Sequence, residues 1–166
     1  MKTGVALGSN LGDRLANLQT ARRAIVGLSG VAPPVVASPV YETEPIDCEP
    51  GAGTFLNAVL EFDYEGEPLD LLGKLIGIEE SLGRERHHTR NTSRQIDLDL
   101  LYFGDRRIDS EQLQLPHPRL QVRRFVLRPL ADIRPDLILP KQTQSVRELL
   151  AQLDDSSKVV QFKDQW

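Results

Sequence analysis

The sequence predicts an α+β fold, with a ferredoxin-like βαββαβ core followed by a C-terminal helical tail. Residues 55–64 alternate between two faces, one of them apolar throughout, which is typical of a strand that buries one side. Apolar residues recur at helical spacing in two separate stretches, 18–28 and 71–82. The resulting order of strand–helix–strand–strand–helix–strand favours an antiparallel or mixed sheet with both helices on one face.

The first half of the chain supplies three of these elements. A short buried strand at 5–7 leads through a glycine-containing turn into a helix, for which Asp13 is the expected N-cap and Gly30 the C-terminal stop. After two prolines, the run 35–41 is predicted as a second strand. Pro39 within it indicates a sheet edge or a β-bulge.

The second half completes the core. The strand at 55–64 is followed by a helix with Pro68 in its first turn, and a strand at 95–103 comes last. Gly73 and Gly77 lie four residues apart on this helix, and each lowers helix stability by about 1 kcal/mol, which predicts close packing against a neighbour. The remaining predicted elements are helices near 125–133 and 145–153 and a short strand at 159–162.

Composition places the chain among ordinary globular proteins. With 166 residues, 40% of them hydrophobic and 27% charged, we expect a single domain over residues 1–166. The net charge of -4 argues against a general nucleic-acid binder. Cys48 is the single cysteine, so no internal disulfide can form. No signal peptide or membrane-length apolar run is apparent, and we expect a cytoplasmic protein without nucleic-acid or membrane partners. We take a monomer as the expected state, although the sequence pattern itself leaves monomer and dimer open.

The run from Arg94 to Asp99 is the most informative part of the sequence. Side chains in a strand alternate faces, so Asp97 and Asp99 share one face with their Cα atoms about 7 Å apart. Two neighbouring carboxylates repel each other, and burying them unpaired is costly. A cation is therefore expected on this face. Mg²⁺ held by one or two carboxylates and by substrate phosphates is the common arrangement.

Basic residues surround the aspartate pair in the sequence. Guanidinium groups bind phosphate bidentately and stay charged. The chain has neither a P-loop nor a Rossmann glycine fingerprint, so a nucleotide would be held by arginines and metal. Carboxylates for metal beside arginines for phosphate favour phosphoryl transfer, with a solvated arginine loop as the plainer alternative. The basic residues are Arg84, Arg86, Arg90 and Arg94 before the pair and His117, Arg119, Arg123 and Arg124 after it.

Ordered motifs along almost the whole chain resemble the 6-hydroxymethyl-7,8-dihydropterin pyrophosphokinases of the folate pathway. They are GSNLG at 8–12, YET at 41–43, FLN at 55–57, LGR at 82–84, RxxDLDLLYFG at 94–104 and LPHP at 115–118. The resemblance implies the ferredoxin-like core. It also implies transfer of the β,γ-diphosphoryl group of ATP to the hydroxymethyl oxygen of the pterin, with release of AMP.

The same resemblance implies roles for individual residues. Asp97 and Asp99 would coordinate two Mg²⁺ ions that bridge the triphosphate of ATP, the co-substrate. Arg84 and Arg94 would act in catalysis and contact phosphates. The other implied ATP-binding residues are Glu79, Ile96, His117 and Arg123, and the implied pterin-binding residues are Thr43, Ile46, Phe55, Asn57 and Phe125.

Some positions depart from the family pattern or allow plainer interpretations. Asn91 stands where many members have a tryptophan over the pterin, and Thr92 stands where a small residue is common. Phe55 and Phe125 could be ordinary packing residues, and Glu79 could be a solvated helix charge. Two other functions remain open: another Mg²⁺-dependent phosphotransferase on the same scaffold, and a non-catalytic module that binds RNA. The sequence identifies no general base.

Overall fold

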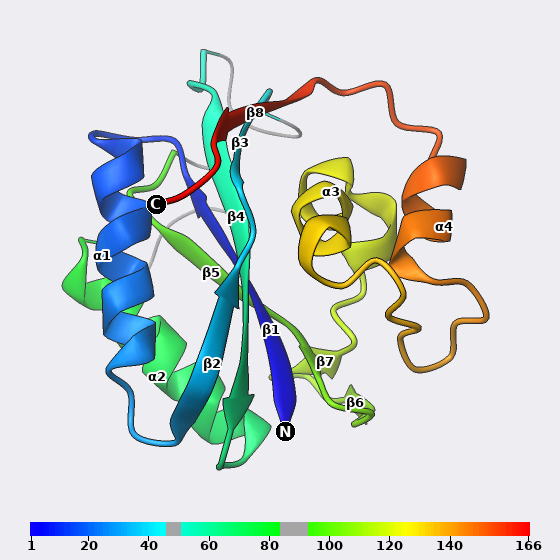
Figure 1. Cartoon of the computed structure of the whole chain (residues 1–166). Coiled ribbons are helices and arrows are strands. Elements are labelled where there is room, and N and C mark those ends of the chain that lie inside the picture. Colours follow the sequence, from blue (N-terminus) through cyan, green and yellow to red (C-terminus); the bar gives the residue numbers. More distant parts are fainter. Residues whose placement is uncertain (46–50, 84–92) are drawn as a thin grey trace.

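The computed structural model describes residues 1–45, 51–83 and 93–166. A six-stranded antiparallel sheet forms the middle layer, in the order β5-β1-β4-β3-β8, and β2 pairs with the second half of β4 (Figure 1). The predicted combination of helices with an antiparallel sheet is confirmed. The strands of the sheet are β1 (Lys2–Ser9), β2 (Val31–Ala37), β3 (Val40–Thr43), β4 (Phe55–Tyr64), β5 (Asp97–Phe103) and β8 (Val159–Lys163).

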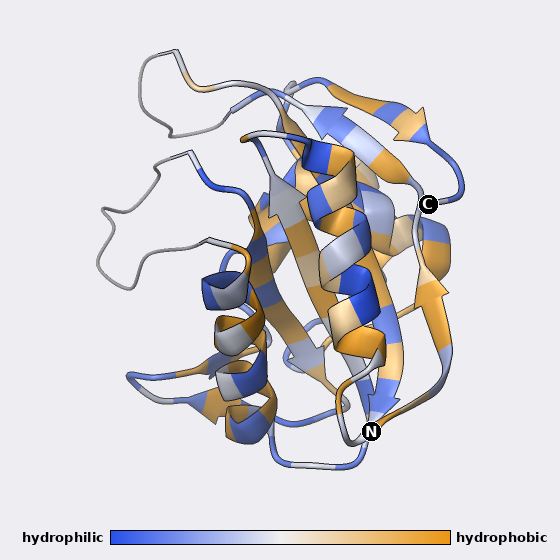
Figure 2. Cartoon of the chain, turned by 90° about the vertical axis from the view of Figure 1, so that its left-hand side faces the viewer, coloured by the Kyte–Doolittle hydropathy of each residue, from blue (hydrophilic) through white to orange (hydrophobic). Residues whose placement is uncertain are grey.

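Helices α1 (Arg14–Val26) and α2 (Pro68–Ser81) cover one face of the sheet and lie side by side (Figures 1 and 2). Asp13 caps α1 as predicted, because its side chain accepts a hydrogen bond from the backbone of Ala16. Alternate residues of β1, β4 and β5 pack with both helices in the larger core. The predicted apolar face of residues 55–64 is the face buried there.

The C-terminal part of the chain forms a second layer on the opposite face. Helix α3 (Arg124–Ile133) packs against β4, and α4 (Val146–Gln152) packs against α3. A smaller core joins them to the sheet through Val59, Leu101 and Tyr102. The chain then returns to the sheet, where β8 pairs with β3. The segment predicted as a tail is therefore packed onto both the face and the edge of the sheet.

Short elements connect β5 to α3. They are the hairpin strands β6 (Ile108–Asp109) and β7 (Gln114–Leu115) and the 3-10 helix η1 (Leu120–Val122). No helix in the described part of the chain is long and apolar enough to cross a membrane.

Three local predictions differ from the structure. The strand predicted at 35–41 is split between β2 and β3 at Ser38, whose hydroxyl accepts a hydrogen bond from the backbone of Val59 at 2.9 Å. Helix α1 ends at Val26 with Gly27 as its C-cap, whereas the predicted stop, Gly30, lies in the following turn with φ of 94°. Gly73 and Gly77 face solvent, and a Cβ on either would meet no atom within 4 Å. The close packing predicted for these two glycines is wrong.

Candidate active site

The register of the sheet brings distant motifs into one row. Gly8 of β1 lies between Asp97 of β5 and Asn57 of β4. All three lie on the face away from α1 and α2. Their neighbours along the strands, Leu7, Ala58 and Leu98, pack in the core with those helices, and successive side chains alternate faces. Two strand spacings, about 10 Å in total, separate Asp97 from Asn57. The carboxylate pair and the predicted pterin-binding amide therefore share one surface.

Arginines compensate the two carboxylates unequally. Asp97 Oδ1 lies 2.8 Å from Nη1 of Arg94, whereas Asp99 Oδ2 is 3.9 Å from Nη1 of Arg123. Burial, followed by the charge of Asp97, raises the pKa of Asp99 to about 6, although Arg123, Arg94 and Arg119 oppose that shift. The Asp99 side chain is still 37% exposed. A cation bound between the carboxylates of Asp97 and Asp99 would reduce their mutual repulsion and would therefore bind favourably.

The amide of Asn57 is fixed on the sheet surface. Its Nδ2 donates a hydrogen bond of 2.7 Å to Thr43 Oγ1, and both residues are buried. Its Oδ1 lies above Gly8, where an added Cβ would come within 2.9 Å of it. Phe55 and Asp97 also have atoms within 4.0 Å of that Cβ position. Gly8 therefore leaves the sheet surface without a side chain between Asn57 and Asp97, the two predicted binding groups.

The sequence interpretation treated residues 8–12 as a turn and as a family motif, and it missed this role of Gly8. A glycine inside a strand often marks the close approach of a ligand or of another chain segment. That signal was present, because Gly8 directly follows the apolar run of the first strand.

The start of α3 brings Arg123 close to both an aromatic ring and a carboxylate. The guanidinium carbon of Arg123 lies 5.2 Å from the centre of the half-buried Phe125 ring, a cation–π distance. The same guanidinium is the group nearest Asp99 in the ion pair described above. Arg123 is therefore close to both Phe125 and Asp99, the residues predicted to bind the pterin and the metal.

The surroundings of His117 favour its neutral form. Burial, together with the charges of Arg123 and Arg119, lowers its pKa to about 4. The backbone N–H of Arg119 donates to Nδ1 at 3.2 Å, so the proton belongs on Nε2. Its own backbone N–H donates to the carbonyl of Leu101 in β5 at 2.8 Å. His117 can therefore donate a hydrogen bond without adding charge.

A cavity of about 380 Å³ lies beside Asp99 and His117. Leu72, Leu100 and Leu113 give it apolar walls, and residues 110–114 around the start of β7 supply polar groups. The sequence interpretation did not find this cavity. The strands β6 and β7 have two residues each and are too short to show a period, and the leucines resembled ordinary core residues.

Other predicted site residues are used differently. The side chain of Ile96 is fully buried in the core under α1 and α2, so it points away from the Asp97 face. Glu79 is 5% exposed, and its Oε1 accepts a 2.7 Å hydrogen bond from the backbone of Leu98; it is no solvated helix charge. Arg124 donates to the backbone carbonyl of Asp155. The predicted residues Arg84 and Ile46, and the departures Asn91 and Thr92, lie outside the described residues.

Comparisons with known proteins identify the family to which the chain belongs. Residues 4–135 match the model of a family described as 7,8-dihydro-6-hydroxymethylpterin-pyrophosphokinase. A 2-amino-4-hydroxy-6-hydroxymethyldihydropteridine pyrophosphokinase of Pseudomonas aeruginosa is 42% identical over 147 residues, covering 89% of this chain and 88% of that protein. A protein of the same name from Methylorubrum extorquens is 40% identical over 152 residues, covering 92% and 93%.

Longer proteins also contain a region similar to this chain. The folic acid synthesis protein fol1 of Schizosaccharomyces pombe is 38% identical over 149 residues, and the match spans 90% of this chain but 20% of that protein. A crystal structure of Plasmodium falciparum HPPK-DHPS with pterin and p-hydroxybenzoate has the same fold, with a TM-score of 0.70 and 16% identity, over 91% of this chain and 42% of that one. The predicted resemblance is confirmed: the chain belongs to the family of 7,8-dihydro-6-hydroxymethylpterin-pyrophosphokinases.

Proposed function

We propose that this pyrophosphokinase passes the β,γ-diphosphoryl group of ATP to the hydroxymethyl oxygen of 6-hydroxymethyl-7,8-dihydropterin, with Asp97 and Asp99 as the Mg²⁺ ligands. The observation that carries the proposal is the row formed by Asp97, Gly8 and Asn57. It sets a metal-binding carboxylate about 10 Å from a fixed amide. A pterin ring at Asn57 can extend its hydroxymethyl arm across Gly8 toward phosphates at Asp97.

The aspartate pair fits magnesium. Both carboxylates are partly exposed on one face, and nearby arginines leave Asp99 undercompensated. Oxygen ligands of this kind suit Mg²⁺, which completes its coordination with phosphates and water, and we propose two ions here. Bound Mg²⁺ would neutralise charge on the triphosphate and align its phosphorus atoms for in-line transfer.

We place the purine of ATP in the 380 Å³ cavity beside Asp99. Its leucine walls suit a flat base, and its polar rim offers hydrogen-bonding groups. His117 would donate through Nε2, and Arg123 would reach the phosphates. Arg94, beside Asp97, and Arg84, on its motif alone, would bind the transferred group.

The pterin would be held on the sheet surface by groups from β3 and β4. Asn57 and Thr43 would hydrogen-bond its edge, and Phe55 and Phe125 would enclose its flat ring. Ile46 would contribute from the following loop. The hydroxymethyl oxygen then forms a bond to the β-phosphorus, the bond from that phosphorus to the oxygen of AMP breaks, and the hydroxyl proton is released. Positioning and charge stabilisation carry the rate.

We further propose that residues 1–166 form one ferredoxin-like catalytic domain that acts as a cytoplasmic monomer. The strand order β5-β1-β4 followed by β2 and β3, with α1 and α2 on one face, supports the ferredoxin-like arrangement. Sedimentation of the purified chain tests the monomer.

Product analysis tests the reaction. The purified protein is incubated with the pterin, ATP and Mg²⁺, and nucleotides are separated by chromatography. AMP that appears only when pterin and Mg²⁺ are both present supports diphosphoryl transfer. ADP instead would mean ordinary kinase or hydrolase chemistry, and the proposed reaction would be wrong. Bound pterin without any nucleotide turnover would also contradict it and would direct attention to Asn91.

A further inference from the structure

Asn10, in the turn after β1, is joined to the segment that leads into β5. Its Oδ1 accepts a hydrogen bond from the backbone N–H of Arg94 at 2.8 Å, and its Nδ2 donates to Ser93 Oγ at 3.2 Å. Its backbone N–H donates to the carbonyl of Arg94 at 3.2 Å. The side chain is buried, at 7% exposure. Both ends of the Asn10 amide are therefore used within the protein.

These bonds determine where the Arg94 side chain begins. The regular pairing of β1 with β5 stops at Gly8 and Asp97, so Ser93 and Arg94 lie beyond the ladder. Asn10 takes the place of a further rung, because it bonds the N–H and the carbonyl of Arg94. The guanidinium of Arg94 then reaches Asp97 at 2.8 Å.

Glu79 of α2 holds the same segment from the other side. Strand β5 is at the edge of the sheet, so within the described ranges no further strand pairs with its outward N–H groups. The N–H of Leu98, between the two aspartates, donates instead to Glu79 Oε1 at 2.7 Å. The Glu79 side chain therefore supplies the acceptor that a neighbouring strand would otherwise provide.

We propose that Asn10 and Glu79 are positioning residues that clamp residues 93–99 from two sides, so that Arg94, Asp97 and Asp99 are in place before the substrates bind. The clamp rests on the proposed function of those three residues. It also gives the motif at 8–12 a second role besides making a turn. Asn10 and Glu79 act through the backbone of the segment, and neither needs to touch a substrate.

The test compares Asn10→Ala with Asn10→Asp and with a matched control, Asn17→Ala. Asn17 lies in the first turn of α1, directly after the turn that contains Asn10, and its Nδ2 donates to Ser9 Oγ and to the carbonyl of Leu11. We expect Asn10→Ala to lower kcat by about 10²-fold, the effect of a small misplacement of catalytic groups, while the pterin Kd stays unchanged. Asn10→Asp keeps the acceptor for Arg94 and should recover most of kcat. Asn17→Ala should lower only the unfolding midpoint.

A parallel pair tests Glu79. Glu79→Gln keeps an oxygen acceptor for Leu98 and should stay within a few-fold of the normal kcat, whereas Glu79→Ala should lose about tenfold or more. Hydrogen exchange gives a readout that does not depend on turnover. Amide protection should fall at Arg94 in Asn10→Ala and at Leu98 in Glu79→Ala.

Three results would overturn the clamp. The first is an equal loss of kcat in Asn10→Ala and Asn17→Ala, which would indicate general damage to the turn. The second is a weaker pterin Kd with normal kcat in Asn10→Ala, which would make Asn10 a substrate contact. The third is unchanged exchange at Arg94 and Leu98. If the unmodified protein forms no AMP, the proposed function fails by itself, and the exchange experiment still decides whether the clamp exists.

Discussion

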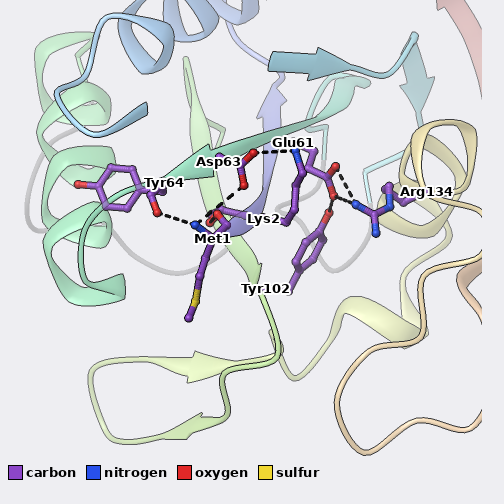
Figure 3. A network of polar contacts seen from close by, with 8 residues as sticks. Met1, Lys2, Glu61, Asp63, Tyr64, Tyr102 and Arg134 are labelled. Atoms are coloured by element: carbon purple, nitrogen blue, oxygen red, sulfur yellow. Dashed lines mark hydrogen bonds and ion pairs between the residues drawn. The ribbon is translucent and has the colours of Figure 1, made fainter. Parts of the chain in front are cut away.

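The two ends of strands β1, β4 and β5 treat charge in opposite ways on the same face of the sheet. At one end, Glu61 is 4% exposed and accepts hydrogen bonds from Arg134 at 2.7 and 2.9 Å and from the hydroxyl of Tyr102 at 2.5 Å (Figure 3). At the other end, Asp99 is 37% exposed and has Arg123 at 3.9 Å. The carboxylate of Glu61 is thus paired within the protein, whereas the carboxylate of Asp99 is only loosely paired and is accessible to solvent.

Two glycines of β1, one at each end, differ in the same way in what lies above them. A Cβ on Gly4 would lie 2.2 Å from the Tyr102 ring, so the protein itself fills the space above this residue. A Cβ on Gly8 would meet Asn57 Oδ1 at 2.9 Å, beside the aspartates. Burial and the bond to Glu61 raise the pKa of Tyr102 and keep its hydroxyl a donor. One end of the strands is filled by the protein's own side chains, and the other carries the groups that we propose bind the substrates.

Replacing either aspartate should have the largest effect of all these changes. It should lower catalytic activity and leave stability nearly unchanged. We expect Asp97→Ala and Asp99→Ala each to lower AMP formation by about 10³-fold or more, because the phosphates lose the metal that balances their charge. The free energy of unfolding should change by less than about 1 kcal/mol, because neither side chain belongs to the core. Turnover assays and urea denaturation measure both. Normal turnover in either variant would remove that residue from the metal site.

The opposite end should show the reverse effect. Glu61→Ala leaves Arg134 and Tyr102 without their buried acceptor, and we expect it to lower the free energy of unfolding by about 3 kcal/mol. At temperatures well below its melting point, kcat should remain within a few-fold of normal. Urea denaturation provides the stability measurement.

Asp63→Ala is the matched control for this end. Asp63 is two residues further along the same strand and pairs with Lys2 at 2.8 Å, but both side chains are well exposed. The Asp63→Ala substitution should leave the free energy of unfolding nearly unchanged, because solvent screens such ion pairs. Equal effects of the Glu61 and Asp63 variants would remove the distinction between a buried and a surface carboxylate here.

The two glycines provide the next comparison. Gly8→Ala should weaken pterin binding by about tenfold or more, because its methyl group displaces the Asn57 amide. Gly4→Ala should instead lower the free energy of unfolding by about 1–3 kcal/mol through overpacking against Tyr102. Titration of pterin fluorescence and thermal melting separate these effects. Unchanged pterin affinity in Gly8→Ala would contradict the placement of the ring across this residue.

The smallest expected effect is a gain in stability at a surface that belongs to neither end. Gly73→Ala and Gly77→Ala should each stabilise α2 by up to about 1 kcal/mol, because each added methyl group meets open space. Turnover should not change. Calorimetry of the single variants and the double variant checks the gain, and a lower melting temperature would show that these glycines serve a purpose in the fold.

The sequence by itself determined the faces of the strands and the family. The alternation of residues 55–64 assigned Leu56 and Asn57 to opposite faces, and the same period placed Asp97 beside Asp99. These predictions hold because the period of a strand is a local property of its backbone. The motifs likewise identified the family, because their order and spacing are written in the chain.

Only the tertiary structure decided which of these faces meet. The row of Asp97, Gly8 and Asn57 depends on the register of three strands that are far apart in sequence, and register follows from packing of the whole sheet. The cavity beside Asp99 needs the hairpin of β6 and β7, and Glu79 is buried only because α2 lies against the edge of β5. Local sequence patterns specify which side chains share a face of a strand or helix. Long-range strand pairing decides which of these faces lie next to one another.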